Sequence, residues 1–143
     1  MKRFALAAAL ALAPLAALAE GVAHKVAIHV DQNDPQVMNM ALNNAQNVAS
    51  YYESKGDTVT IEMVTYGPGL NMLIAEKSPV AQRISTMSLE MDNITFAACA
   101  NTMAGMKKKT GHDVVLMSEA VVVPSGVVRL IELQEDGFAY IRP

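Results

Sequence analysis

Short apolar runs rich in β-branched residues alternate along this chain with longer segments whose apolar residues recur at helical spacing. The runs predict strands over 25–30, 58–66, 94–99, 120–123 and 138–141. The segments between them predict helices over 35–55, 69–75, 80–89, 101–109 and 126–134. Alternation of this kind implies right-handed βαβ units, so we expect an α/β domain with a mostly parallel sheet and helices on both faces.

Residues at the ends of these segments agree with the predicted boundaries. Asp34 can cap the first helix and Pro35 suits its first position, while Gly56 suits its C-terminal end. Asp92 and Asn93 form a turn before the third strand. Local and long-range patterns therefore point to the same order of elements.

Candidate site residues follow three of the predicted strands. Tyr66 and Gly67 come after the second strand, Cys99 ends the third, and Ser125 and Gly126 follow the fourth. Sites in parallel sheets lie beyond the carboxyl ends of the strands, so we expect these residues to share one rim and to form a candidate binding site. Tyr66 suits either the lining of such a rim or packing beneath it.

Cys99 carries the most distinctive chemistry because it is the only cysteine and stands where a strand runs into a helix. Backbone N–H groups and the helix dipole favour an anion at a helix N-terminus, which lowers a thiol pKa and makes the thiol nucleophilic at neutral pH. A single cysteine forms no internal disulfide. The alternatives are a buried inert thiol and a thiol paired with another molecule.

Asn101 and Thr102 follow Cys99, and the sequence is consistent with two roles for them. They suit the cap of the third helix, and they also suit the orientation of an adduct on Cys99. The small side chains of Ala97, Ala98 and Ala100 would leave room for such an adduct, although they suit tight strand packing equally well.

The N-terminal residues predict an export signal. Lys2 and Arg3 precede an apolar stretch over 4–18, and Ala17 to Ala19 form a small-x-small cleavage site. The stretch is shorter than a spanning helix needs. We expect a signal peptide over 1–19, cleavage after Ala19, and a single periplasmic domain over 20–143 that has no membrane association after cleavage.

Charge and composition exclude several classes of partner. Removal of Lys2 and Arg3 leaves nine basic against fourteen acidic residues, a formal charge of −5, which argues against nucleic acid. The basic run at 107–109 suits the end of the third helix. Histidines and methionines are scattered, with His24 and His29 predicted on opposite faces of a strand. We therefore expect neither a metal site nor a cofactor.

The chain resembles the DsrE/DsrF-like (YchN-like) family over residues 24–143. The segments that carry the resemblance are 96–103 around Cys99, 122–129 around the Pro-Ser-Gly motif, 133–141, and 47–52 with 67–69. The resemblance implies a three-layer α/β fold with a five-stranded, largely parallel sheet of flavodoxin-like topology. It also implies assembly into trimers or hexamers, and Cys99 as an acceptor of persulfide sulfur.

Two hypotheses for function follow. The first is an exported sulfur-handling protein that accepts or carries sulfur on Cys99 and exchanges it with a donor or acceptor protein. Because there is no second, resolving cysteine, a carrier is expected rather than a self-contained enzyme. The second is a non-catalytic oligomeric binding module with a structural cysteine.

Overall fold

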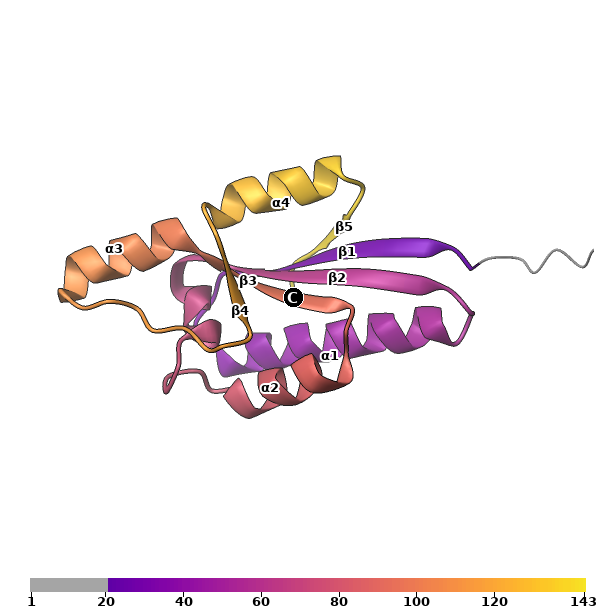
Figure 1. Ribbon diagram of the computed structural model, residues 1–143, viewed down its shortest axis with the longest axis horizontal. Helices are drawn as coiled ribbons and strands as arrows, with labels where there is room; N and C mark the ends of the chain where they lie inside the picture. Colours follow the sequence, from indigo (N-terminus) through magenta and orange to yellow (C-terminus); the bar gives the residue numbers. More distant parts are fainter. Residues whose placement is uncertain (1–20) are drawn as a thin grey trace, which may run out of the picture.

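The computed structural model of the protein describes residues 21–143, so the predicted signal peptide lies outside the described part of the chain. Strands and helices alternate in the predicted order (Figure 1). The elements are β1 Ala23–Val30, α1 Pro35–Glu53, β2 Thr58–Thr65, the 3-10 helix η1 Gly67–Leu73, α2 Ala81–Glu90, β3 Ile94–Cys99, α3 Ala100–Thr110, β4 Ala120–Val123, α4 Gly126–Glu135 and β5 Ala139–Ile141.

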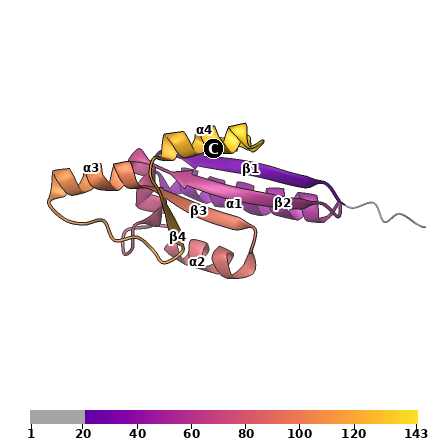
Figure 2. The same cartoon turned by 45° about the horizontal axis from the view of Figure 1, so that its top comes forward.

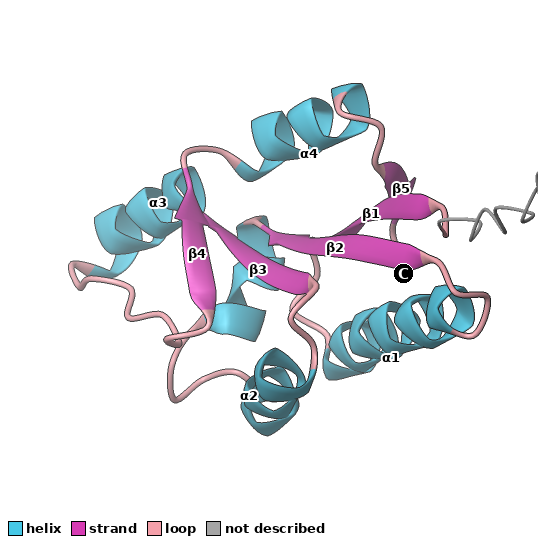
Figure 3. Ribbon diagram, turned by 45° about the vertical axis from the view of Figure 1, so that its right-hand side comes forward, coloured by secondary structure: helices cyan, strands magenta, loops and turns pink. Residues whose placement is uncertain are grey.

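All strand pairs in the sheet are parallel, and the strand order is β4-β3-β2-β1-β5. Helices α1 and α2 cover one face and α4 covers the other (Figure 3). The predicted α/β class with a five-stranded parallel sheet is confirmed. The order differs from the flavodoxin order 2-1-3-4-5, because here the first four strands follow one another across the sheet. Only the last connection, through α4, returns to the outer side of β1.

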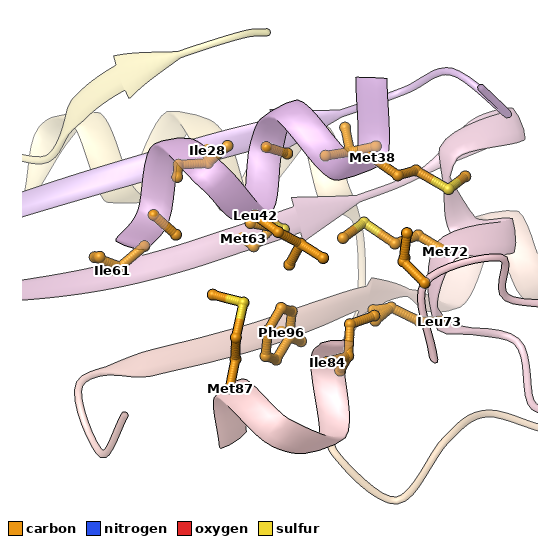
Figure 4. Close-up of a cluster of buried hydrophobic side chains, with 14 of the residues drawn as sticks. Ile28, Met38, Leu42, Ile61, Met63, Met72, Leu73, Ile84, Met87 and Phe96 are labelled. Carbon is orange, nitrogen blue, oxygen red and sulfur yellow. The ribbon is translucent and has the colours of Figure 1, made fainter. Parts of the chain in front are cut away.

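The face covered by α1 and α2 holds the main core. Ile28, Met63 and Phe96 project from neighbouring strands towards Leu42 of α1 and Met87 of α2, and all five are essentially without solvent exposure (Figure 4). Among the methionines, Met38, Met72 and Met87 are buried and Met103 is partly buried against this core. Flexible methionine side chains fill a core of this shape well.

The opposite face has a much smaller core. Ala27, Val64 and Ala97 of the sheet pack there against Leu130 and Leu133 of α4. Only one helix, α4, covers this face, and it leaves part of β3 and β4 uncovered (Figure 2). None of the helices among residues 21–143 is long and apolar enough to cross a membrane.

The boundary signals in the sequence act as expected at the first helix. The Asp34 carboxylate accepts the backbone N–H of Gln36 at 2.7 Å, and Pro35 occupies the first helical position. The helix ends at Glu53, and Gly56 adopts a positive φ of 77° in the turn that follows. That left-handed conformation suits glycine, which lacks the Cβ that disfavours it in other residues.

Candidate functional site

Cys99 is at once the last residue of β3 and the N-cap of α3. Its Sγ accepts the backbone N–H of Thr102 at 3.4 Å, the bond that a capping side chain normally makes. The residue is only 4% exposed. The prediction that Asn101 or Thr102 caps this helix is therefore wrong, because β3 continues into α3 without a loop and the cap position falls on Cys99.

The N-terminus of a second helix, α4, also lies at the thiol. Gly126 is the first residue of α4, and hydrogen bonding by its N–H group lowers the pKa of Cys99, as does hydrogen bonding by the N–H groups of Asn101 and Thr102 and by the Thr102 hydroxyl. Burial raises the pKa of the Cys99 thiol, but these hydrogen bonds outweigh it and lower the pKa overall. The N-termini of α3 and α4 thus jointly favour a thiolate.

Thr102 connects the thiol to the turn after β2. Its Oγ1 accepts the backbone N–H of Gly67 at 2.9 Å, which leaves the hydroxyl proton free to be donated to Cys99. The Thr102 side chain therefore lies beside the sulfur, and the predicted orientation of an adduct on Cys99 stays a prediction. Asn101 takes part through its backbone, while the residue itself is exposed and its N–H also lies 3.3 Å from the Pro124 carbonyl oxygen.

Tyr66 lies directly against Gly126, the first residue of α4. A Cβ placed on Gly126 would lie 2.7 Å from Tyr66 Cδ1 and 2.9 Å from Tyr66 Cβ, so glycine is the residue that permits this approach. Burial raises the pKa of Tyr66, which is therefore an uncharged, partly buried wall of the rim. Ser125 is the N-cap of α4, but its side chain makes no capping hydrogen bond.

The structure adds residues that the sequence reasoning did not select. His29 Nδ1 lies 2.7 Å from the Tyr140 hydroxyl, and its ring stacks on Tyr66 with centroids 4.6 Å apart. Beside them, Arg142 and Asp31 form an ion pair at 2.8 Å. The residues after β5 thus lie at this rim, beside the loop that follows β1. Alternation along β1 predicted the face on which His29 lies, but no local pattern indicated its partners.

His29 is only 5% exposed, and its Nε2 atom has no hydrogen-bond partner among the described residues. Burial lowers the pKa of His29, with Asp31 opposing this effect and Arg142 adding to it. A neutral imidazole is therefore favoured. Within residues 21–143, no three His, Cys, Asp or Glu side chains are grouped so as to hold a metal ion.

The fold and the site define a class: an open, parallel α/β domain with one thiol between two helix N-termini. No protein-family model and no curated protein matches the chain. A solved structure does, that of MTH1491 from Methanobacterium thermoautotrophicum, a protein of unknown function. The two chains are 30% identical with a TM-score of 0.71, and the match covers 84% of this chain and 99% of MTH1491. The chain therefore belongs to the same family as MTH1491.

Proposed function

We propose that this protein accepts sulfur on Cys99 and carries it as a persulfide. The observation that carries the proposal is the hydrogen bonding of one thiol by the first N–H groups of two helices, α3 and α4. These donors lower the pKa of Cys99 although burial raises it, which favours the nucleophilic thiolate over the thiol. The resemblance of segment 96–103 to the DsrE/DsrF-like family gives the same expectation.

The transfer step is an exchange between a thiolate and a persulfide. The Cys99 thiolate attacks the outer sulfur of a donor R–S–SH, a new S–S bond forms to Cys99, and the donor S–S bond breaks to release R–S⁻. The electron pair of the broken bond leaves with the donor, so no external oxidant or reductant is needed. The same N–H groups that favour the Cys99 thiolate favour it again as the leaving group when an acceptor thiolate attacks.

The partners of this exchange must be other molecules. Cys99 is the only cysteine, so no thiol of this chain can resolve the persulfide. A donor protein and an acceptor protein are therefore part of the proposal, and a carrier fits it better than an enzyme with its own turnover. The signal peptide predicted over 1–19 would place this exchange in the periplasm.

The test is the intact mass of the mature protein purified without reductant, followed by incubation with a small-molecule persulfide. We expect a mass increase of one or more sulfur atoms that is absent in Cys99→Ser. We expect Thr102→Val to slow alkylation of Cys99 at neutral pH about tenfold, whereas Thr102→Ser keeps the hydroxyl and the rate. A thiol that takes up no sulfur and resists alkylation until the protein is denatured contradicts the proposal.

One observation favours the second hypothesis, a binding module with a structural cysteine. Cys99 is 4% exposed and its sulfur already serves as a helix cap. A purely structural thiol would be replaced by serine with retention of the cap and with little change in any binding property of the protein. The persulfide experiment therefore distinguishes the two hypotheses directly.

A further inference from the structure

His29 is a buried polar side chain that the proposed sulfur chemistry does not use. It lies near the carboxyl end of β1, on the same face of the sheet as Ala27, which packs against α4. Two aromatic side chains hold the imidazole. Its Nδ1 atom lies 2.7 Å from the Tyr140 hydroxyl, and its ring stacks on Tyr66 with centroids 4.6 Å apart and an angle of 25° between the planes. Because His29 is only 5% exposed, these contacts leave its ring little freedom to move.

The Tyr66 ring also touches the first residue of α4. A Cβ placed on Gly126 would lie 2.7 Å from Tyr66 Cδ1 and 3.1 Å from its Cγ, so the glycine backbone is in direct contact with the ring. Tyr66 therefore contacts both His29 and the start of α4. Packed side chains compress little, so a ring with two such neighbours transmits a displacement from one to the other.

The start of α4 lies beside Cys99. Strand β4 runs parallel to β3 with Val123 opposite Cys99, and the Asn101 nitrogen lies 3.3 Å from the Pro124 carbonyl oxygen. Gly126 follows two residues later, and hydrogen bonding by its N–H group favours the Cys99 thiolate. A hydrogen bond weakens steeply with poor distance and angle, so a small displacement of the start of α4 would weaken this contribution.

We propose that His29 is a positioning residue for Cys99 and that it acts through the Tyr66 ring. By holding this ring against Gly126, His29 keeps the start of α4 beside the sulfur. The proposal deepens the proposed function and rests on it, because it concerns the reactivity of the thiol that would accept sulfur. It also gives a role to β5, whose Tyr140 holds the imidazole from one edge of the sheet.

The arrangement of the strands favours this indirect role over direct proton transfer between His29 and Cys99. His29 lies on β1 and Cys99 on β3, with β2 between them. At the usual spacing of neighbouring strands, β1 and β3 are about 10 Å apart. Burial also lowers the pKa of His29 and favours the neutral imidazole, so replacing it removes no charge at neutral pH. The charged groups that act on His29, Asp31 and Arg142, remain in every variant used below.

The rate of alkylation of Cys99 by iodoacetamide, measured as a function of pH, tests this role. His29→Gln retains a polar group for Tyr140 but removes the stacking ring. We expect its profile to shift to higher pH, with alkylation at pH 7 about threefold slower and no fall in the limiting rate at high pH. His29→Phe retains a ring and should keep the original profile. His24→Ala is the matched control, because it removes a similar stack, on Tyr52, at the other end of β1 and should leave the profile unchanged.

A second variant tests whether His29 acts through Tyr66. Tyr66→Ala should shift the profile at least as far as His29→Gln, and the double variant should shift it no further than Tyr66→Ala alone. Three results would overturn the proposal: an unshifted profile for His29→Gln, an equal shift for His29→Phe, and additive shifts in the double variant. Circular dichroism checks that each variant is folded. The measurement uses no persulfide, so its failure is distinguishable from failure of the proposed sulfur transfer.

Discussion

The two faces of the sheet differ in what they bury. Towards α1 and α2 the sheet buries large apolar side chains such as Ile28, Met63 and Phe96, which form one continuous core. Towards α4 it buries few apolar residues, and it also buries His29 and Glu62 and presents Cys99. Residues paired across the strands confirm this division, since Phe96 opposes Met63 on one face and Ala97 opposes Val64 on the other.

This difference assigns stability to one face of the sheet and chemistry to the other. A thick apolar core gains stability in proportion to the area it removes from water, whereas buried polar groups need partners and contribute little net stability. A protein that keeps its buried titratable groups on one face can vary them while the other face maintains the fold. Each prediction below changes a residue of one face and measures stability, the reactivity of Cys99, or both.

The largest effect is expected in the main core. Phe96→Ala removes a fully buried ring between β3 and α2 and should lower the free energy of unfolding by about 3–5 kcal/mol. Urea denaturation measures the change. In the molecules that stay folded, the pH dependence of Cys99 alkylation should be unchanged, although Phe96 and Cys99 lie on the same strand. A shifted alkylation profile would mean that the two faces are coupled.

A smaller loss is expected on the α4 face. Glu62→Gln removes the closer carboxylate partner of Arg129 and leaves only Glu132 at 3.7 Å. The change should cost about 2–3 kcal/mol, because Arg129 is one-third exposed and water compensates part of the loss. The double variant Glu62→Gln/Arg129→Met removes the unpaired charge and should recover part of the stability. If the single change costs nothing, the pair does not hold α4 on the sheet.

Much of this fold was predictable from the sequence because local and long-range patterns agree. The β-branched run over 58–66 and the capping residues Asp34 and Pro35 locate β2 and α1 within a few residues. The order of strands was not predictable in the same way. Whether α4 returns to β1 or extends the sheet beyond β4 depends on packing between distant segments, which no local pattern describes.

Only the site residues that directly follow a strand could be predicted from the sequence. Cys99, Gly67 and Gly126 were expected on one rim, and the structure joins them through hydrogen bonding at the thiol and at the Thr102 hydroxyl. The cap was misplaced by two to three residues because cysteine is not a typical capping residue. The stacking of His29 on Tyr66 joins residues far apart in the sequence, and only the three-dimensional register brings them together.

The approach of α4 to the thiol can be tested with one methyl group. Gly126→Ala places a Cβ against Tyr66, which should displace the start of α4 and remove one N–H donor from Cys99. We expect a rise in the pKa of Cys99, seen as an alkylation profile shifted to higher pH, with a loss of about 1–2 kcal/mol in stability. Gly105→Ala is the matched control in α3, where an added Cβ meets open space and neither property should worsen. A profile that stays in place after Gly126→Ala would mean that α4 contributes nothing to the thiolate.

The smallest effect is expected at His29, where it depends on pH. Because burial lowers the pKa of His29 in the folded protein, the unfolded chain binds a proton more readily. His29 therefore reduces stability as the pH falls below about 6.5, and it has no such effect above that value. His29→Phe keeps an aromatic ring against Tyr66, removes the unpartnered Nε2 and loses the bond to Tyr140, so at pH 8 stability should change by no more than about 1 kcal/mol.

The direction of this pH dependence can be checked by urea denaturation at several pH values between 8 and 5. The measurement compares His29→Phe with the unaltered protein. The variant should gain stability relative to the unaltered protein as the pH falls through about 6.5. His24→Phe is a useful comparison, because His24 lies on the opposite face, stacked on Tyr52 and paired with Asp57. A relative loss of stability for His29→Phe at low pH would show that His29 is protonated and paired in the folded protein. The α4 face would then hold a buried cation rather than a neutral ring.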